Sequence, residues 1–541
     1  SSRAALCTRF RWVAHQPLHL LRSCPLDAMV HRRRPEARLG PAARWLPAVA
    51  AAALAVAPLG SALEILVYAK FVRASSHQLA MRRVAEALVQ AGHSVILLEP
   101  EAAAARLGEP RTEGLTVWRL RVMDDANYSA RFQAGQSFQR LSQEVNAQLL
   151  PEARARVHGR HFDLAVVDAL YPLLARELAL PSLHVQCASD PDAISGLWFH
   201  YGLAAPNRDK TSNMRFALLW LMSWLFVGSH QDSTASSATL SWGDYYQHHV
   251  LALLVQGTPR FALPFEAAPV VAAHPGRLAF VGSLTARSGA NPPAEAADLS
   301  AKIEGSGSGG LALVAFGTNP NPCPLAILEA LHEVGLTAII LVEACQGNAE
   351  VAAHHVLPTS RDQSAWLLAP GLRLAVVHGG LHSLHEAVGV GVPVACVPHE
   401  GDQWANCKDL QRQHLGWAVH PNAEAPEAVA AFRMLLGGSG GAAVAGGATS
   451  AERSAAYAAA VAALAEASGP AAIVRHIQRF IDTGTRPSEW HRQLPPLQPF
   501  FAEPWCWPEF WTVLALSVSL VLLIVGCLRT AVDSDVRNKA D

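Results

Sequence analysis

The sequence predicts an α/β protein with two domains, each built on a parallel β-sheet. Two series of short apolar runs support this prediction, one starting near Leu63 and the other near Leu311. Each run is followed by a glycine or polar turn and then by a helical stretch, which is the order of parallel strands connected by helices. The chain has 541 residues, which exceeds one hydrophobic core and agrees with two domains plus targeting segments.

The first series opens with the strand LEILVYA, from Leu63 to Ala69, and continues into a helix from about Gln78 to Gln90. Gly92 ends this helix. The remaining predicted elements are a strand at 94–98, a strand at 162–170 that includes Asp168, a helix from Pro172, a strand at 180–187 and a buried or membrane-grazing helix at 214–228.

The second series consists of similar apolar strands. We expect it to be preceded by a flexible connection at 305–310, and a low-complexity loop lies at 437–447. An alanine-rich helical region at 451–481 closes the second domain. The strands of this series begin at Leu311, Ala338, Leu372 and Pro393.

Two further segments predict secretion and membrane anchoring. From Met29, where we expect the chain to initiate, a basic stretch, an apolar run and small residues are typical of a signal peptide, with an uncleaved anchor or a transit peptide as the alternatives. The uncharged run from Phe510 to Leu528 has the length of a transmembrane helix, and a buried soluble helix is its alternative. Together they predict a single-pass type I membrane protein with lumenal domains.

Charge and cysteine content exclude other classes. The formal net charge is −1 and the body carries no long basic block, so we expect no nucleic-acid partner. The nine cysteines show no C-x-x-C pair or regular spacing, which argues against a disulfide scaffold and a zinc module and leaves their role open.

Polar residues that follow parallel strands mark the candidate site, because ligands collect outside the carboxyl ends of such strands. At His378-Gly379-Gly380 a strand ends and a helix begins. The glycines allow backbone amides to approach a ligand, and a helix N-terminus favours negative charge, so the triplet suits a diphosphate. A structural strand-to-helix turn is the alternative.

The longer run AVVHGGLHSLHEAVGVGVPVACVPHEGDQWAN, residues 375–406, resembles the signature segment of the UDP-glycosyltransferases, in particular the membrane-bound, glucuronosyltransferase-like branch of family 1. Weaker resemblance covers roughly residues 64–528. It implies a GT-B fold, in which two Rossmann-like domains face a cleft. The implied organisation is an upstream segment and signal peptide (1–62), an acceptor-binding domain (63–275), a nucleotide-sugar-binding domain (276–485), a linker (486–509), a transmembrane helix (510–528) and a cytoplasmic tail (529–541).

The resemblance also assigns the donor-binding residues. His378, Gly380 and Ser383 would bind the diphosphate and Glu386 the ribose hydroxyls. Asp402 and Gln403 would bind the sugar hydroxyls, with a solvated acidic loop as the alternative. The full implied donor set is Gly317, Thr318, His378, Gly379, Gly380, Ser383, Glu386, Asp402 and Gln403.

His77 stands where the family has its catalytic base, and Asp168 stands where it has the aspartate partner of that base. A histidine can deprotonate an acceptor hydroxyl near neutral pH, and a carboxylate on one ring nitrogen fixes its tautomer. A structural histidine, one of 24 in the chain, and a helix-capping aspartate are the alternatives.

The implied activity is inverting transfer of a hexosyl or glucuronosyl group from a UDP-sugar to a hydroxyl of a small lipophilic acceptor. The implied cell compartment is the endoplasmic reticulum. No metal and no cofactor besides the UDP-sugar donor are expected, and a homo-oligomer stays open. The alternatives are a catalytically silent homologue that binds a nucleotide sugar or a lipid, and another sugar-nucleotide enzyme such as a hydrolysing epimerase.

Three positions depart from the family pattern and leave uracil recognition open. His382 replaces an asparagine, Val356 a tryptophan and Thr359 a glutamine, and Trp366 is our substitute for the missing tryptophan. A rival interpretation takes three histidines at helical spacing as metal ligands, although the glycines interrupt the helix start. These histidines are His378, His382 and His385.

Overall fold

The computed structural model describes residues 62–494 with gaps, and a few positions beyond them. The gaps are 70–74, 102–106, 111, 122–126, 128–129, 132–137, 170, 188–239, 241–243, 246–247, 264–270, 273–275, 286–290, 307–308, 318–320, 357, 359–361, 400–401 and 438–449; the positions beyond 494 are 512, 514–519 and 522–523. The expected signal peptide, the 214–228 segment, the expected cytoplasmic tail and most of the 510–528 run lie outside the described residues.

The first sheet has eight strands in the order β3-β2-β1-β4-β5-β6-β7, and β8 pairs with β6. All pairs are parallel except β6 with β7. The elements are β1 (Glu64–Tyr68), α3 (Ser75–Gln90), β2 (Ser94–Pro100), β3 (Thr116–Leu120), α6 (Phe138–Val157), β4 (Leu164–Asp168), α7 (Leu173–Glu177), β5 (Ser182–Val185), β6 (Val250–Thr258), β7 (Phe261–Ala262) and β8 (Leu278–Gly282).

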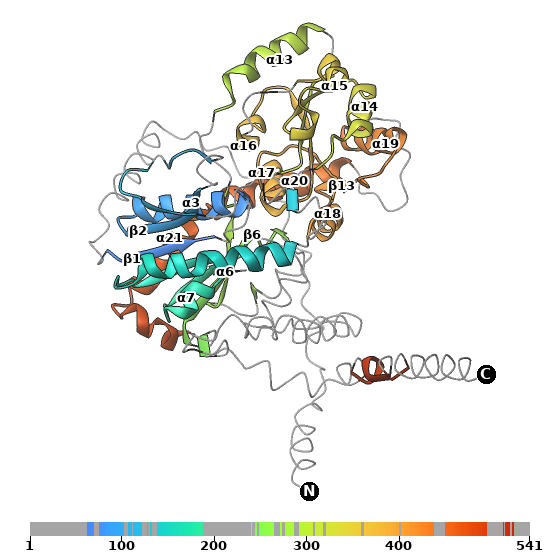
Figure 1. The fold of residues 1–541 in the computed structure, drawn as a ribbon. Helices are drawn as coiled ribbons and strands as arrows, with labels where there is room; N and C mark the ends of the chain where they lie inside the picture. The colour runs from blue at the N-terminus through green and yellow to red at the C-terminus, as the bar shows by residue number, and fades with distance from the viewer. Residues whose placement is uncertain are drawn as a thin grey trace, which may run out of the picture. The chain divides into compact units, whose positions relative to one another are not determined.

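Helices cover both faces of this sheet. Side chains alternate along β1, so that Leu66 packs in a core with α6 and α7, while Ile65 packs in the opposite core with α3. Figure 1 shows α6 and α7 side by side, and Arg154 of α6 reaches Glu177 of α7 at 2.7 Å. The apolar runs of the sequence are therefore strands buried on two faces, as predicted.

The second sheet has five parallel strands in the order β10-β9-β11-β12-β13. Its two faces are covered by separate cores, one with α17, α18 and α20, the other with α14 and α19. The elements are α13 (Ala294–Ser306), β9 (Leu311–Ala315), α14 (Leu325–Glu333), β10 (Thr337–Ile340), the 3-10 turn η4 (Glu343–Cys345), α15 (Ala349–His354), α16 (Gln363–Trp366), β11 (Leu372–Val377), α17 (Leu381–Gly389), β12 (Val394–Cys396), α18 (Gln403–Arg412), β13 (Gly416–Ala418), α19 (Ala425–Leu435) and α20 (Ser450–Ala467).

The C-terminal helices differ from the expectation. The helical region expected at 451–481 is interrupted at Gly469, and α21 (Pro470–Ile481) packs in the core of the first sheet. The 3-10 turn η5 (Pro487–Gln493) follows it and buries Trp490 in the same core, although the sequence predicts a linker there. β8 also joins the first sheet although it follows the boundary expected at 275. The first domain is therefore completed by segments distant in sequence, which apolar periodicity cannot assign to a sheet.

The expected membrane span stays a prediction. Within the described part of the chain, no single helix is long and apolar enough to cross a membrane. The helices Ser454–Ala467 and Pro470–Ile481, which are bent by 47° relative to each other, together have the length and apolar composition of a membrane span.

Candidate active site

His77 and Asp168 are brought together by neighbouring strands. β1 precedes the helix that carries His77, β4 ends at Asp168, and the two strands pair in register from Ile65↔Leu164 to Tyr68↔Val167. His77 Nδ1 lies 2.6 Å from Asp168 Oδ2, and the two side chains are 8% and 0% exposed. In the tautomer that donates Nδ1–H to the carboxylate, Nε2 carries the lone pair that accepts a proton. The arrangement suits a histidine base oriented by a carboxylate.

A buried ion pair fixes the helix of His77. Arg82, five residues further along α3, donates from Nη2 to both carboxylate oxygens of Glu99 in β2, at 2.7 and 2.8 Å. Burial raises the pKa of Glu99, and the charge of Arg82 opposes that shift. Because this bidentate pair holds α3 against β2, it restricts the position of His77.

The diphosphate candidate consists of glycines packed around one imidazole. Gly317 follows β9 and His378 follows β11, two paired strands. A Cβ atom on Gly317 would lie 2.8 Å from His378 Nε2, and one on Gly380 would lie 2.5 Å from it. Desolvation lowers the pKa of His378 to about 4, so the ring is neutral at pH 7. This ring can therefore donate or accept a hydrogen bond but carries no positive charge.

Gly317, His378 and Gly380 are called the cradle below. Helix α17 begins directly after Gly380, which is its N-cap residue, and no side chain caps the helix. Its first amides are the kind of group that binds phosphate oxygens. Ser383 donates to Gln363 Oε1 at 3.1 Å, and Gln363 donates to Glu386 Oε2 at 3.0 Å. Gln363 of α16 therefore connects the residue predicted to bind the diphosphate with the residue predicted to bind the ribose.

Gln363 is a site residue that sequence reasoning missed. We placed Thr359 in the position of the family's glutamine, and Thr359 lies outside the described residues. Gln363, four positions further on, makes the contacts with Ser383 and Glu386. The available signal was a glutamine three positions before Trp366, at the first residue of the same short helix. That tryptophan is 0% exposed in the core of the second sheet, so our proposal that it stacks on uracil is wrong.

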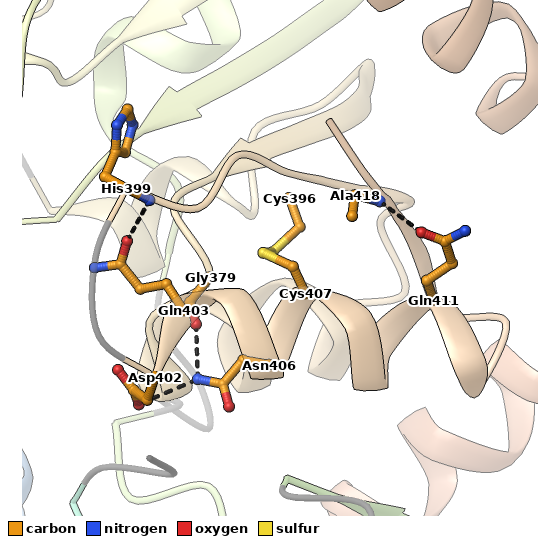
Figure 2. Close-up of a disulfide and its surroundings, with 9 residues drawn as sticks. All are labelled: Gly379, Cys396, His399, Asp402, Gln403, Asn406, Cys407, Gln411 and Ala418. Atoms are coloured by element: carbon orange, nitrogen blue, oxygen red, sulfur yellow. Dashed lines mark hydrogen bonds between the residues drawn. A yellow bond between two sulfur atoms is a disulfide. The ribbon is translucent and has the colours of Figure 1, made fainter. Parts of the chain in front are cut away.

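Asp402 is the N-cap residue of α18 and Gln403 is the first residue of this helix (Figure 2). Gln403 Oε1 accepts a hydrogen bond from the backbone N–H of His399 at 2.8 Å. Asn406 donates to the carbonyl of Gly379 at 2.9 Å and to Asp402 Oδ2 at 3.2 Å. Asn406 therefore connects a residue predicted to bind the sugar with a residue predicted to bind the diphosphate. Sequence patterns did not single out Asn406.

A disulfide packs behind the turn that contains Gly379. Cys396, at the end of β12, is bonded to Cys407 of α18 (Figure 2). Gly379 has φ +88°, and a Cβ atom there would lie 2.7 Å from Cys407 Sγ and 3.0 Å from Cys396 Sγ. No other residue fits without displacing the disulfide. A second disulfide joins Cys323 to Cys345, so two bonds are present that cysteine spacing failed to indicate.

His382 connects the two groups of residues. Its ring centroid lies 6.1 Å from that of His77, and its Nε2 lies 3.0 Å from Nε2 of Gln256 in β6. The pKa of His382 is lowered well below its ordinary value, chiefly by burial. His382 lies in α17, the helix that follows the diphosphate candidate, so this helix brings a side chain next to the base candidate.

The rival metal interpretation is not supported. His378, His382 and His385 do not converge, because His385 is fully buried with its ring against Phe261 at 5.0 Å between centroids. In the described part of the chain, the group of ligand-type side chains close enough to share an ion is a different one, His77, Asp168 and Cys187. Thr318 lies outside the described residues, so its expected role stays a prediction.

The protein has two domains, each built on a mainly parallel sheet, and the candidate site residues follow the ends of the strands. This arrangement is a GT-B glycosyltransferase fold. The structure is similar to the solved glycotransferase of kitacinnamycin, with a TM-score of 0.54 and 17% identity over 77% of this chain and 99% of that one. It is also similar to CalG4, the calicheamicin glycosyltransferase, with a TM-score of 0.51 and 17% identity over 77% and 98% of the two chains. Identities this low establish the fold alone.

The resemblance to UDP-glycosyltransferases is confirmed. Residues 270–429 match the family described as UDP-glucoronosyl and UDP-glucosyl transferase. The chain is 25% identical to UDP-glucuronosyltransferase 3A1 of Xenopus laevis over 312 residues, 51% of this chain and 56% of that protein. It is 22% identical to UDP-glucuronosyltransferase 1A5 of Rattus norvegicus over 392 residues, 64% and 71% of the two chains. The first of these matches thus spans about half the length of its relative.

Proposed function

We propose that the protein transfers a hexosyl or glucuronosyl group from a UDP-sugar to the hydroxyl of a small lipophilic acceptor, with inversion at the anomeric carbon. The contact between His77 and Asp168 is the observation that carries this proposal. It provides a proton acceptor whose tautomer is held by a carboxylate, in a fold that glycosyltransferases share.

The proposed reaction is a single displacement. His77 removes the proton of the acceptor hydroxyl, the resulting oxygen attacks the anomeric carbon, and the bond to the diphosphate breaks as UDP leaves with the electron pair. Asp168 stabilises the imidazolium that forms. The first amides of α17 and the neutral ring of His378 meet the charge on the leaving diphosphate. Gly317 and Gly380 leave space beside His378 for this contact. Gly379 and Thr318 would line the same diphosphate site, as the family resemblance implies.

The donor side has a proposed division of labour. Ser383 would bind the diphosphate, Glu386 the ribose hydroxyls, and Asp402 with Gln403 the transferred sugar. The hydrogen bonds of Gln363 and Asn406 support this division because they hold these side chains around the start of α17 and α18. We further propose an anchored, lumenal protein of the endoplasmic reticulum. The two disulfides support it, since such bonds persist in oxidising compartments.

Substitution of the base tests the proposal. We expect His77→Ala to reduce transfer about 10²- to 10⁴-fold, because general base catalysis contributes about that much. UDP binding should be retained, since His77 is not among the donor residues. Turnover is measured by mass spectrometry with UDP-glucose, UDP-galactose and UDP-glucuronate against lipophilic alcohols and phenols, and UDP binding by calorimetry.

His332→Ala is the matched control, because His332 lies in α14 of the other domain beside His354, with ring centroids 4.5 Å apart. It should leave transfer unchanged. If His77→Ala and wild type both bind UDP and neither transfers sugar to any acceptor, the silent, ligand-binding homologue is the better description.

A further inference from the structure

The carboxyl ends of three adjacent strands place a third polar side chain beside the base pair. Strands β1, β4 and β5 are neighbours in the first sheet. His77 lies in the first turn of the helix after β1, Asp168 ends β4, and Cys187 lies two residues after β5. One ligand atom from each residue lies within 4.8 Å of the other two, and all three residues are buried. Cys187 is a thiol rather than a disulfide sulfur.

We propose that His77, Asp168 and Cys187 form a binding site for a soft divalent cation of the Zn²⁺ class. Imidazole, carboxylate and thiolate are all ligands that Zn²⁺ accepts in tetrahedral sites, whereas the hard cations Mg²⁺ and Ca²⁺ prefer oxygen ligands alone. A thiolate and a carboxylate together neutralise the charge of the ion. A buried site of this kind therefore avoids the cost of an uncompensated charge.

The distances are compatible with a modest rearrangement. Zn²⁺ bonds of about 2.0–2.3 Å at tetrahedral angles place ligand atoms about 3.3–3.8 Å apart. The pair of His77 Nδ1 and Asp168 Oδ2, now at 2.6 Å, would have to separate by about 1 Å. Cys187 Sγ lies within 4.8 Å of both other ligand atoms, so it would have to approach by at most about 1.5 Å.

Coordination has a consequence for the dyad. The ion takes the place of the proton between His77 Nδ1 and Asp168, and that proton moves to Nε2, so the imidazole stays neutral and its base nitrogen is blocked. The Cys187 thiol loses its proton to solvent or to another base. Asp168 then bonds the metal instead of the imidazole. On the proposed function, the cation is therefore a reversible inhibitor of transfer and not a participant in it.

Metal titration of the purified full-length protein, in the absence of any sugar donor, tests the site. Co²⁺ is the spectroscopic probe, because a thiolate ligand gives a charge-transfer band, and Zn²⁺ affinity is measured by competition with a chromophoric chelator. We expect Cys187→Ser to remove the band and to weaken Zn²⁺ binding by more than about 10- to 100-fold, which is the loss typical of removing a residue that only supports a metal ligand. Cysteines outside the described residues are identical in both proteins, so the difference reports Cys187.

Two variants complete the design. Asp168→Asn keeps the shape of the side chain and removes its charge, so it should weaken Zn²⁺ binding while the thiolate band persists; it also serves if Cys187→Ser does not fold. His332→Ala, at the separate histidine pair, should change neither reading. A band and affinity equal to wild type in Cys187→Ser would mean an adventitious ion only. Since no step of this titration requires catalysis, its failure is distinct from failure of the transfer assay.

Discussion

The two halves of the candidate site are constructed differently. The base pair is a single direct contact between two buried side chains, His77 and Asp168, whose strands are neighbours. The donor half is assembled from glycines that pack against His378 and against the disulfide of Cys396, together with side chains that bond one another. The first half should therefore be sensitive to the identity of one functional group. The donor half should be sensitive to added side-chain volume at its glycines and to loss of the groups that pack against them.

The largest effect should come from changing one atom type in the base pair. Asp168→Asn keeps the volume, but an amide can present its NH₂ group to His77 Nδ1 and stabilise the wrong tautomer. We expect the turnover number to fall about 10²- to 10⁴-fold with little change in UDP affinity. Turnover and calorimetric UDP binding measure the two quantities. A variant that loses UDP binding to the same extent would contradict the separation of the two halves.

Loss of support should affect the donor half next. Removing a disulfide typically costs about 2–4 kcal/mol in the free energy of unfolding. We expect Cys407→Ala to show this loss and also to weaken UDP binding, because its sulfur packs against Gly379. Cys345→Ala, which breaks the other disulfide, is the control: it should lower stability and leave UDP affinity unchanged. Chemical denaturation and calorimetry separate these outcomes, and equal UDP affinities in the two variants would count against a supporting role.

How much of this could be predicted differs between the halves. The strands and the glycine turns were predictable, because apolar runs buried on two faces and residues at their ends are local features. The family resemblance predicted the contact between His77 and Asp168. Local sequence patterns could not predict it, because 91 positions separate the two residues. Apolar periodicity cannot show that β8, α21 and Trp490 complete the first core, since it does not identify the sheet a segment joins.

The missed residues have a common physical reason. Gln363, Asn406 and Gln256 act by bonding other side chains or backbone groups of the site. A polar residue with such a role looks like any surface residue in a sequence. The disulfides were missed similarly, because 22 and 11 residues separate their cysteines and neither spacing is a known motif. Spatial neighbours are needed to recognise both.

A smaller effect should follow from filling space in the cradle. A methyl group at Gly380 would lie 2.5 Å from His378 Nε2, so the ring must move away from the diphosphate candidate. Overpacking of this kind costs about 1–3 kcal/mol, and we expect UDP binding to weaken about tenfold or more in Gly380→Ala. Gly389→Ala is a matched control in the same helix, where the new carbon would meet Leu464 at an ordinary 3.8 Å. Comparable losses of UDP affinity in both would show that helix α17 as a whole, not the ring, is the sensitive feature.

The smallest effect concerns how α17 packs, and it depends on pH. Neither ring nitrogen of His385 has a hydrogen-bond partner among the described residues, and burial lowers the pKa of His385 to about 3. An unfolded histidine has a pKa near 6.5, so below that pH the unfolded chain binds one more proton than the folded chain. Stability should therefore be fully present above about pH 6.5 and be lost as the pH falls, by up to about 1.4 kcal/mol per unit from this residue.

His385→Leu removes this proton and keeps an apolar side chain against Phe261. Between pH 7.5 and 5.5, we expect the wild type to lose about 1 kcal/mol more unfolding free energy than the variant, measured by urea denaturation at both values. Other buried histidines, such as His184, whose pKa burial lowers to about 3, remain in both proteins and cancel in the comparison. If the two proteins lose stability in parallel, His385 is protonated in the folded state, and helix α17 must then open enough for water to reach it.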